Sequence, residues 1–194
     1  DERKRPERAR PVRKRVVLFS PHPDDDVISM GGTFLRLVEQ GHEVHVAYQT
    51  SGNIAVTDDD ARRYAQFARD LVASLAPESE AFDALYREVE QFFEHKKLGA
   101  ADISPVRTIK GLIRKGEATA ACRYFGLDDD RIHFLNLPFY ETGLIEKKPV
   151  GEADYKIIMD LLKKVRPHQV YAAGDLRDPH GTHRVCLEAI FESL

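Results

Sequence analysis

Short apolar runs alternate with longer stretches of helical periodicity along most of this chain. Residues 16–19 and 169–173 are apolar at most positions, which predicts strands buried on both faces of a parallel sheet. Two further strands are predicted at residues 43–50, where apolar and polar positions alternate, and at 131–135. The helical spacing of apolar positions predicts helices over residues 27–38, 58–75, 81–98, 104–124, 152–165 and 185–190.

The alternation of strands and helices sets the fold class. It favours a parallel sheet with right-handed crossovers and helices on both faces. We therefore predict an α/β protein with a three-layer, Rossmann-like parallel sheet. We take its strand order to be 3-2-1-4, with room for a further strand. In this order the first and fourth strands are neighbours, and ligands bind beyond the carboxyl ends of the strands at such a switch point.

Length and composition limit the class of protein. The 194 residues, 42% hydrophobic and 31% charged, suit one soluble domain with a sizeable core. The net charge of −3 argues against a general nucleic-acid binder. Cys122 and Cys186 suggest no disulfide framework, and there is neither an apolar run of membrane-spanning length nor a signal-peptide core. We therefore expect a cytoplasmic protein that does not bind membranes.

Two segments depart from the regular pattern. Residues 1–14 are basic and lack apolar periodicity, so we interpret them as a linker or tail, and a linker implies an upstream domain. The domain itself would cover residues 15–194. Three helices are predicted between the second and third strands, more than a minimal crossover needs. We therefore expect residues 77–103 to form an inserted helical hairpin that serves as a lid or a partner surface. No helix stop signal precedes residue 194, so we expect the natural chain to continue, and assembly into a homo-oligomer stays open.

The first strand leads into a turn, residues 21–26, with the sequence Pro-His-Pro-Asp-Asp-Asp. Pro23 pushes His22 toward an extended conformation, so a tight turn can bring His22 and Asp25 to one point while Asp24 approaches from another side. An imidazole and a carboxylate are two of the three protein ligands of a catalytic zinc site. A helix cap is the alternative interpretation, but it explains one aspartate and not a histidine with three.

The fourth strand leads into a turn of the same kind, residues 174–183. Its Asp-Pro-His-Gly-Thr-His sequence places His180 and His183 three residues apart at a helix start, beside Asp178. A lone histidine is usually structural, whereas two histidines in such a turn are better metal candidates. Because the two turns follow neighbouring strands, residues about 160 positions apart should meet in one cleft.

The two turns together resemble the PIG-L/LmbE family of metal-dependent N-acetylglucosaminyl deacetylases, whose signature is an early His-Pro-Asp-Asp-Glu and a late His-x-x-His. The resemblance spans residues 15–194 and implies removal of an acetyl group from an N-acetylated amino sugar by metal-activated water. It implies that His22, Asp25 and His183 bind the metal. Zinc is the leading metal, and iron or cobalt would also suit these ligands. It further implies that Asp24 is the general base and that His180 stabilises the transition state.

Other features of the sequence do not identify the substrate. Asp26 stands where the family usually has glutamate, and Asp178 where some members have tyrosine. The candidates for supporting or substrate contacts are Asp26, Asp178, Arg177, Asn53, Asn136 and Tyr140. Residues 20–56 look especially like the deacetylase-like part fused behind a glucosamine-6-phosphate deaminase domain in some bacterial proteins. An accessory domain of such a fusion and a non-catalytic Rossmann-like binding module therefore remain alternatives, although the glycine-rich nucleotide fingerprint is absent.

Overall fold

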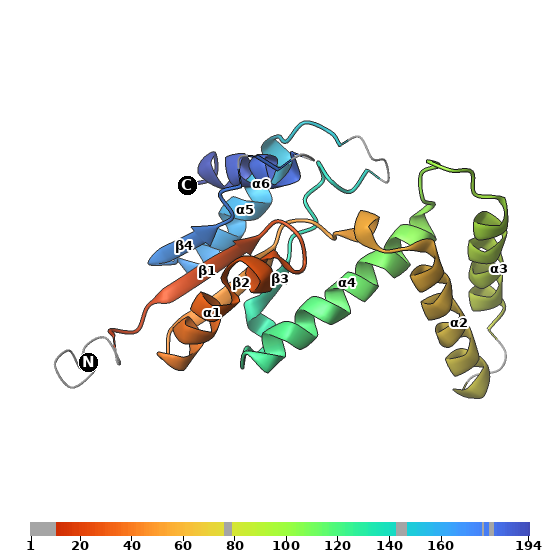
Figure 1. Ribbon diagram of the computed structural model, residues 1–194, viewed down its shortest axis with the longest axis horizontal. Coiled ribbons are helices and arrows are strands. Elements are labelled where there is room, and N and C mark those ends of the chain that lie inside the picture. Colours follow the sequence, from red (N-terminus) through yellow and green to blue (C-terminus); the bar gives the residue numbers. More distant parts are fainter. Residues whose placement is uncertain (1–10, 76–78, 143–146, 176, 179–180) are drawn as a thin grey trace.

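A four-stranded parallel sheet forms the centre of the computed structural model, which describes residues 11–75, 79–142, 147–175, 177–178 and 181–194 (Figure 1). The strands are β1 (Arg15–Ser20), β2 (Glu43–Tyr48), β3 (Ile132–Phe134) and β4 (Gln169–Ala172). Their order is β3-β2-β1-β4, so the predicted order is confirmed. Phe19 pairs with Ala47 on one side and Ala172 on the other, which places the carboxyl ends of β1 and β4 side by side.

Helices cover both faces of the sheet, which confirms the three-layer α/β fold. Helices α1 (Asp25–Glu39) and α4 (Ser104–Tyr124) lie on one face, and α5 (Glu152–Val165) and α6 (Thr182–Phe191) lie on the other. Val16 and Leu18 of β1 pack toward α1 and α4, whereas the alternate residues Val17 and Phe19 pack toward α5 and α6. All four are at most 4% exposed, because both faces of the central strand are buried.

Two helices lie apart from the sheet, at the N-terminal end of α4 (Figure 1). Helices α2 (Asp58–Leu75) and α3 (Glu80–His95) pack on each other and on α4 around a small apolar core. The insertion predicted at residues 77–103 thus contains the single helix α3, and its hairpin partner is α2 rather than a second helix within that range. None of the helices in the described ranges combines the length and apolarity needed to cross a bilayer.

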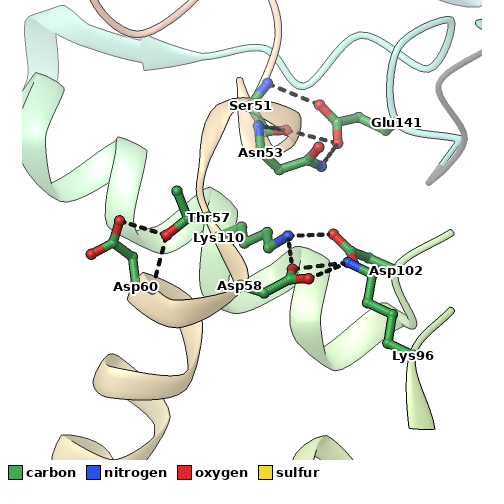
Figure 2. Close-up of polar contacts among 9 residues, drawn as sticks. All are labelled: Ser51, Asn53, Thr57, Asp58, Asp60, Lys96, Asp102, Lys110 and Glu141. Carbon is green, nitrogen blue, oxygen red and sulfur yellow. Dashed lines mark hydrogen bonds and ion pairs between the residues drawn. The ribbon is translucent and has the colours of Figure 1, made fainter. Parts of the chain in front are cut away.

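A network of ion pairs joins three parts of the chain: α2, α4 and the segment that follows α3 (Figure 2). Lys110 Nζ lies 2.7 Å from Asp58 Oδ1 and 2.8 Å from Asp102 Oδ2, and Lys96 Nζ lies 2.7 Å from a carboxylate oxygen of each. Lys110 is only 4% exposed, so its charge needs these partners. We call these four residues the Lys110 network; it fixes the first turns of α4 against α2.

Candidate metal centre

The turn after β1 brings His22 and Asp25 together. Asp25 Oδ2 accepts the backbone N–H of His22 at 2.9 Å and lies 3.2 Å from His22 Nδ1. Helix α1 begins at Asp25, and the carbonyl of Asp24 accepts the N–H groups of Val27 and Ile28 as the first helical hydrogen bonds. The carboxylate of Asp25 therefore lies at a helix N-terminus, where the helix dipole favours negative charge.

The turn after β4 delivers His183 to the same point. Gly181, with φ +72°, precedes α6 in a left-handed conformation, and His183 is the second residue of the helix. Asp178 Oδ2 accepts the backbone N–H of His183 at 2.9 Å, and this bond satisfies one of the free donors of the first helical turn. Asp178 thus positions His183 through its backbone.

The three side chains present their ligand atoms to one another. His183 Nε2 lies 3.2 Å from His22 Nδ1 and 3.3 Å from Asp25 Oδ2, which closes a nearly equilateral triangle with the 3.2 Å edge between His22 and Asp25. Tetrahedral zinc, with bonds of about 2.0–2.1 Å, holds its ligand atoms about 3.3–3.4 Å apart. His22, Asp25 and His183 could therefore hold a metal ion.

The electrostatics of Asp25 suit a ligand. Burial alone would raise the pKa of its carboxyl group, but hydrogen bonds from the side chain and backbone of His22, together with the nearby charge of His183, lower the pKa below its usual range. The carboxylate is consequently ionised at neutral pH, as a metal ligand must be.

Asp24 precedes Asp25 in the same turn, but its carboxylate pairs with a residue outside the triangle. Its Oδ2 is 3.0 Å from Nη2 of Arg114 on α4, and its side chain is 41% exposed. Arg114 also approaches Glu117, one helical turn away, at 3.6 Å. The local spacing of Arg114 and Glu117 is visible in the sequence, whereas the closer contact with Asp24 spans 90 positions and has no local signal.

Asp26 supports the turn from beneath. It is 3% exposed; its Oδ2 accepts the hydroxyl of Tyr48 at 2.9 Å, and its backbone N–H donates to Ser20 Oγ at 3.0 Å. Burial raises the pKa of its carboxyl group. Asp26 therefore links β1, β2 and α1 through packing and hydrogen bonds.

The other predicted site residues lie in several different places. Tyr140 packs edge-on against the ring of His22, with centroids 5.9 Å apart, and burial raises the pKa of Tyr140 to about 12. Asn53 and Asn136 line one cavity beside the turn that carries His22. Arg177 is exposed on the loop after β4. His180 lies outside the described residues.

Two loop residues outside the predicted set of site residues shape this region. Glu141 accepts hydrogen bonds from the backbone N–H and the hydroxyl of Ser51, at 2.9 and 3.0 Å (Figure 2). Gly52 has φ +64°, and a Cβ on it would lie 2.8 Å from Cδ of Pro23. Only glycine lets the loop after β2 approach the His22 turn this closely. A Ser-Gly-Asn run after a strand was the available signal.

Two relatives and one family model match this chain. A glucosamine-6-phosphate deaminase-like protein of Bacteroides thetaiotaomicron is 55% identical over 204 residues, which cover 100% of this chain and 29% of that relative. This chain thus spans less than a third of the length of that relative. A diacetylchitobiose deacetylase of Thermococcus kodakarensis is 38% identical over 47 residues, 24% of this chain and 18% of that protein. The family model for PIG-L, GlcNAc-PI de-N-acetylase, matches residues 17–194, and the chain therefore belongs to the PIG-L family.

Proposed function

We propose that this domain is a metal-dependent hydrolase that removes the acetyl group from an N-acetylated amino sugar. The observation that carries the proposal is the triangle of His22, Asp25 and His183 at the switch point of the sheet. Asp24 precedes Asp25 in the same turn, and its carboxylate pairs with Arg114. Family membership supports the reaction class. The diacetylchitobiose deacetylase similarity supports an acetylated sugar as the substrate.

His22, Asp25 and His183 would hold the metal as two imidazoles and one carboxylate. Zinc is the leading metal for this set, with Fe²⁺ or Co²⁺ as alternatives. A bound metal would supply Lewis acidity to the amide carbonyl and lower the pKa of water toward about 7. The rest of the chemistry falls to residues of the chain itself.

Asp24 is the proposed general base. It is outside the triangle, its side chain is 41% exposed, and Arg114 holds it through Oδ2. We assign the proton transfer from the attacking water to Oδ1, and the same carboxyl group can return the proton to the leaving amine. Arg114 would act as a positioning residue for Asp24. The role of His180 in stabilising the transition state remains a prediction from the family resemblance.

The test compares Asp24→Asn with Asp25→Asn, two substitutions that preserve shape. Asp24→Asn should retain its metal and lose turnover by about 100-fold or more, the usual scale for loss of a general base. Asp25→Asn should lose metal, and excess metal should partly restore its activity. Metal analysis and amine release from N-acetylated amino sugars measure both. Rescue of Asp24→Asn by metal would exchange the two roles, and unchanged turnover in both variants would refute hydrolysis at this turn.

A second proposal concerns the whole protein. Because the chain spans 29% of its Bacteroides relative, we propose that it works as one domain of a longer cytoplasmic protein whose other part acts on amino-sugar phosphates. Turnover of an acetylated amino sugar by the isolated domain would favour the hydrolase. Metal binding without turnover of any such sugar would favour an accessory role.

A further inference from the structure

A cavity of about 370 Å³ lies beside the candidate metal centre, within the size range of small-ligand sites. It is bounded by α4, by the loops after β2 and β3, and by Pro23. Pro23 stands between His22 and Asp24 in sequence, so one wall of the cavity is the turn that carries the proposed chemistry. The described residues that line the cavity do not include His22, Asp25 or His183, so a molecule that occupies both sites would have to pass Pro23.

Two cations of α4 line the cavity. Arg107 and Lys115 are eight residues apart with Gly111 between them, so all three lie on one face of the helix. In the part of the chain that the structure describes, neither cation has an ion-pair partner, whereas Lys110 and Arg114 of the same helix both pair with aspartates. Lys115 Nζ lies 5.1 Å from the ring centroid of Phe134, which places it over the end of β3.

The carboxylate that lines the cavity, Glu141, already accepts hydrogen bonds from the protein. Glu141 accepts hydrogen bonds from Ser51 at 2.9 and 3.0 Å and lies 3.4 Å from Nδ2 of Asn53 (Figure 2). It fixes the loop after β2 and compensates neither Arg107 nor Lys115 by direct contact. The cavity therefore retains a net positive charge that the protein does not neutralise, next to amide groups of Asn53 and Asn136.

We propose that this cavity binds the phosphate group of a phosphorylated, N-acetylated amino sugar, with Arg107 and Lys115 as its specificity-determining residues. A phosphate monoester is close to dianionic at neutral pH, and a guanidinium fork with an ammonium group complements it. The neutral amides of Asn53 and Asn136 suit sugar hydroxyl groups. The assignment rests on the proposed deacetylase function for the acetyl end of the substrate.

The experiment uses steady-state kinetics of the metal-loaded protein with N-acetylglucosamine 6-phosphate, N-acetylglucosamine and diacetylchitobiose. The phosphorylated sugar should have the highest kcat/KM. Arg107→Gln should raise its KM about tenfold to a hundredfold with little change in kcat, and leave the neutral sugars unaffected. Lys115→Gln should act in the same direction, and the wild-type KM for the phosphorylated sugar should rise with salt. Arg123→Gln is the matched control, because Arg123 lies on the same helix but pairs with Asp129 outside the cavity.

A binding measurement separates this proposal from the proposed function. Calorimetric titration with glucosamine 6-phosphate should show binding that Arg107→Gln weakens and Arg123→Gln does not. Such binding without hydrolysis of any acetylated sugar would support the phosphate subsite and refute the deacetylase. Hydrolysis with equal kcat/KM for phosphorylated and neutral sugars, or a KM unchanged by Arg107→Gln, would overturn the subsite.

Discussion

Replacing Lys110 by methionine should lower the free energy of unfolding by about 2 kcal/mol. Methionine keeps the apolar stem and removes the ammonium group from the Lys110 network. Breaking a buried ion pair costs about 3–5 kcal/mol, because the partner charges stay buried and uncompensated. The loss here should be smaller than that, since the Asp58 side chain is 41% exposed and Lys96 still contacts both Asp58 and Asp102.

The pH dependence of this loss in stability follows from the pKa of Asp58. Burial alone would raise the pKa of Asp58, but hydrogen bonds from Lys110 and Lys96 outweigh it and lower the pKa below 3.8. A lowered pKa contributes stability that is present above the unfolded value and is lost as the pH falls through the folded value. The difference in stability between wild type and Lys110→Met should therefore be constant from about pH 5 to 9 and shrink below about pH 4.

Thermal and urea unfolding of both proteins provide the assay. For a chain of this size, 2 kcal/mol corresponds to a Tm shift of about 4–8 °C. Lys156→Met is the matched control, because Lys156 pairs with Asp160 at 2.8 Å but the two side chains are 70% and 57% exposed. Its cost should be only a small fraction of that of Lys110→Met, because water screens an exposed pair. Equal losses in the two variants, or no loss in Lys110→Met, would refute the assigned role of the network.

Two further substitutions test the turn after β1. Gly52→Ala should weaken metal binding and lower Tm, because the new Cβ must displace Pro23. Gly99→Ala is the control for backbone strain alone, because Gly99 has φ +77° with open space around it. Equal effects of the two variants in metal titrations would contradict the role of the contact between residue 52 and Pro23. Tyr48→Phe should lower the free energy of unfolding by about 1–3 kcal/mol in urea, because buried Asp26 loses a hydroxyl donor at 2.9 Å; a loss below about 0.5 kcal/mol would contradict that support.

The elements that rest on local pattern were predictable from the sequence. The β1 run is apolar on both faces because both faces are buried, and helices α2, α4 and α5 begin and end at the predicted residues. The strand order assumed for such a sheet is the observed one, and it places the two turns side by side. Strand and helix bounds elsewhere shifted by a few residues.

The contacts that no local pattern encodes were not predictable. Glu141 reaches Ser51 across 90 positions, and Lys110 reaches Asp58 across 52. Each pair forms only once α4 and the loops take their places on the sheet. The partner of α3 was not predictable for the same reason, since α3 packs on α2 through apolar side chains that suit either arrangement. The metal triangle was the exception, because its two turns follow adjacent strands.

Metal content measured by mass spectrometry on purified, dialysed protein tests the central claim most directly. The wild-type chain should carry about one divalent metal, and His183→Ala and Asp25→Asn should carry far less, because each removes one corner of the triangle. His95→Ala, an exposed histidine on α3, should keep the wild-type content. Full metal content in both His183→Ala and Asp25→Asn would contradict the metal centre, and with it the hydrolase built upon it.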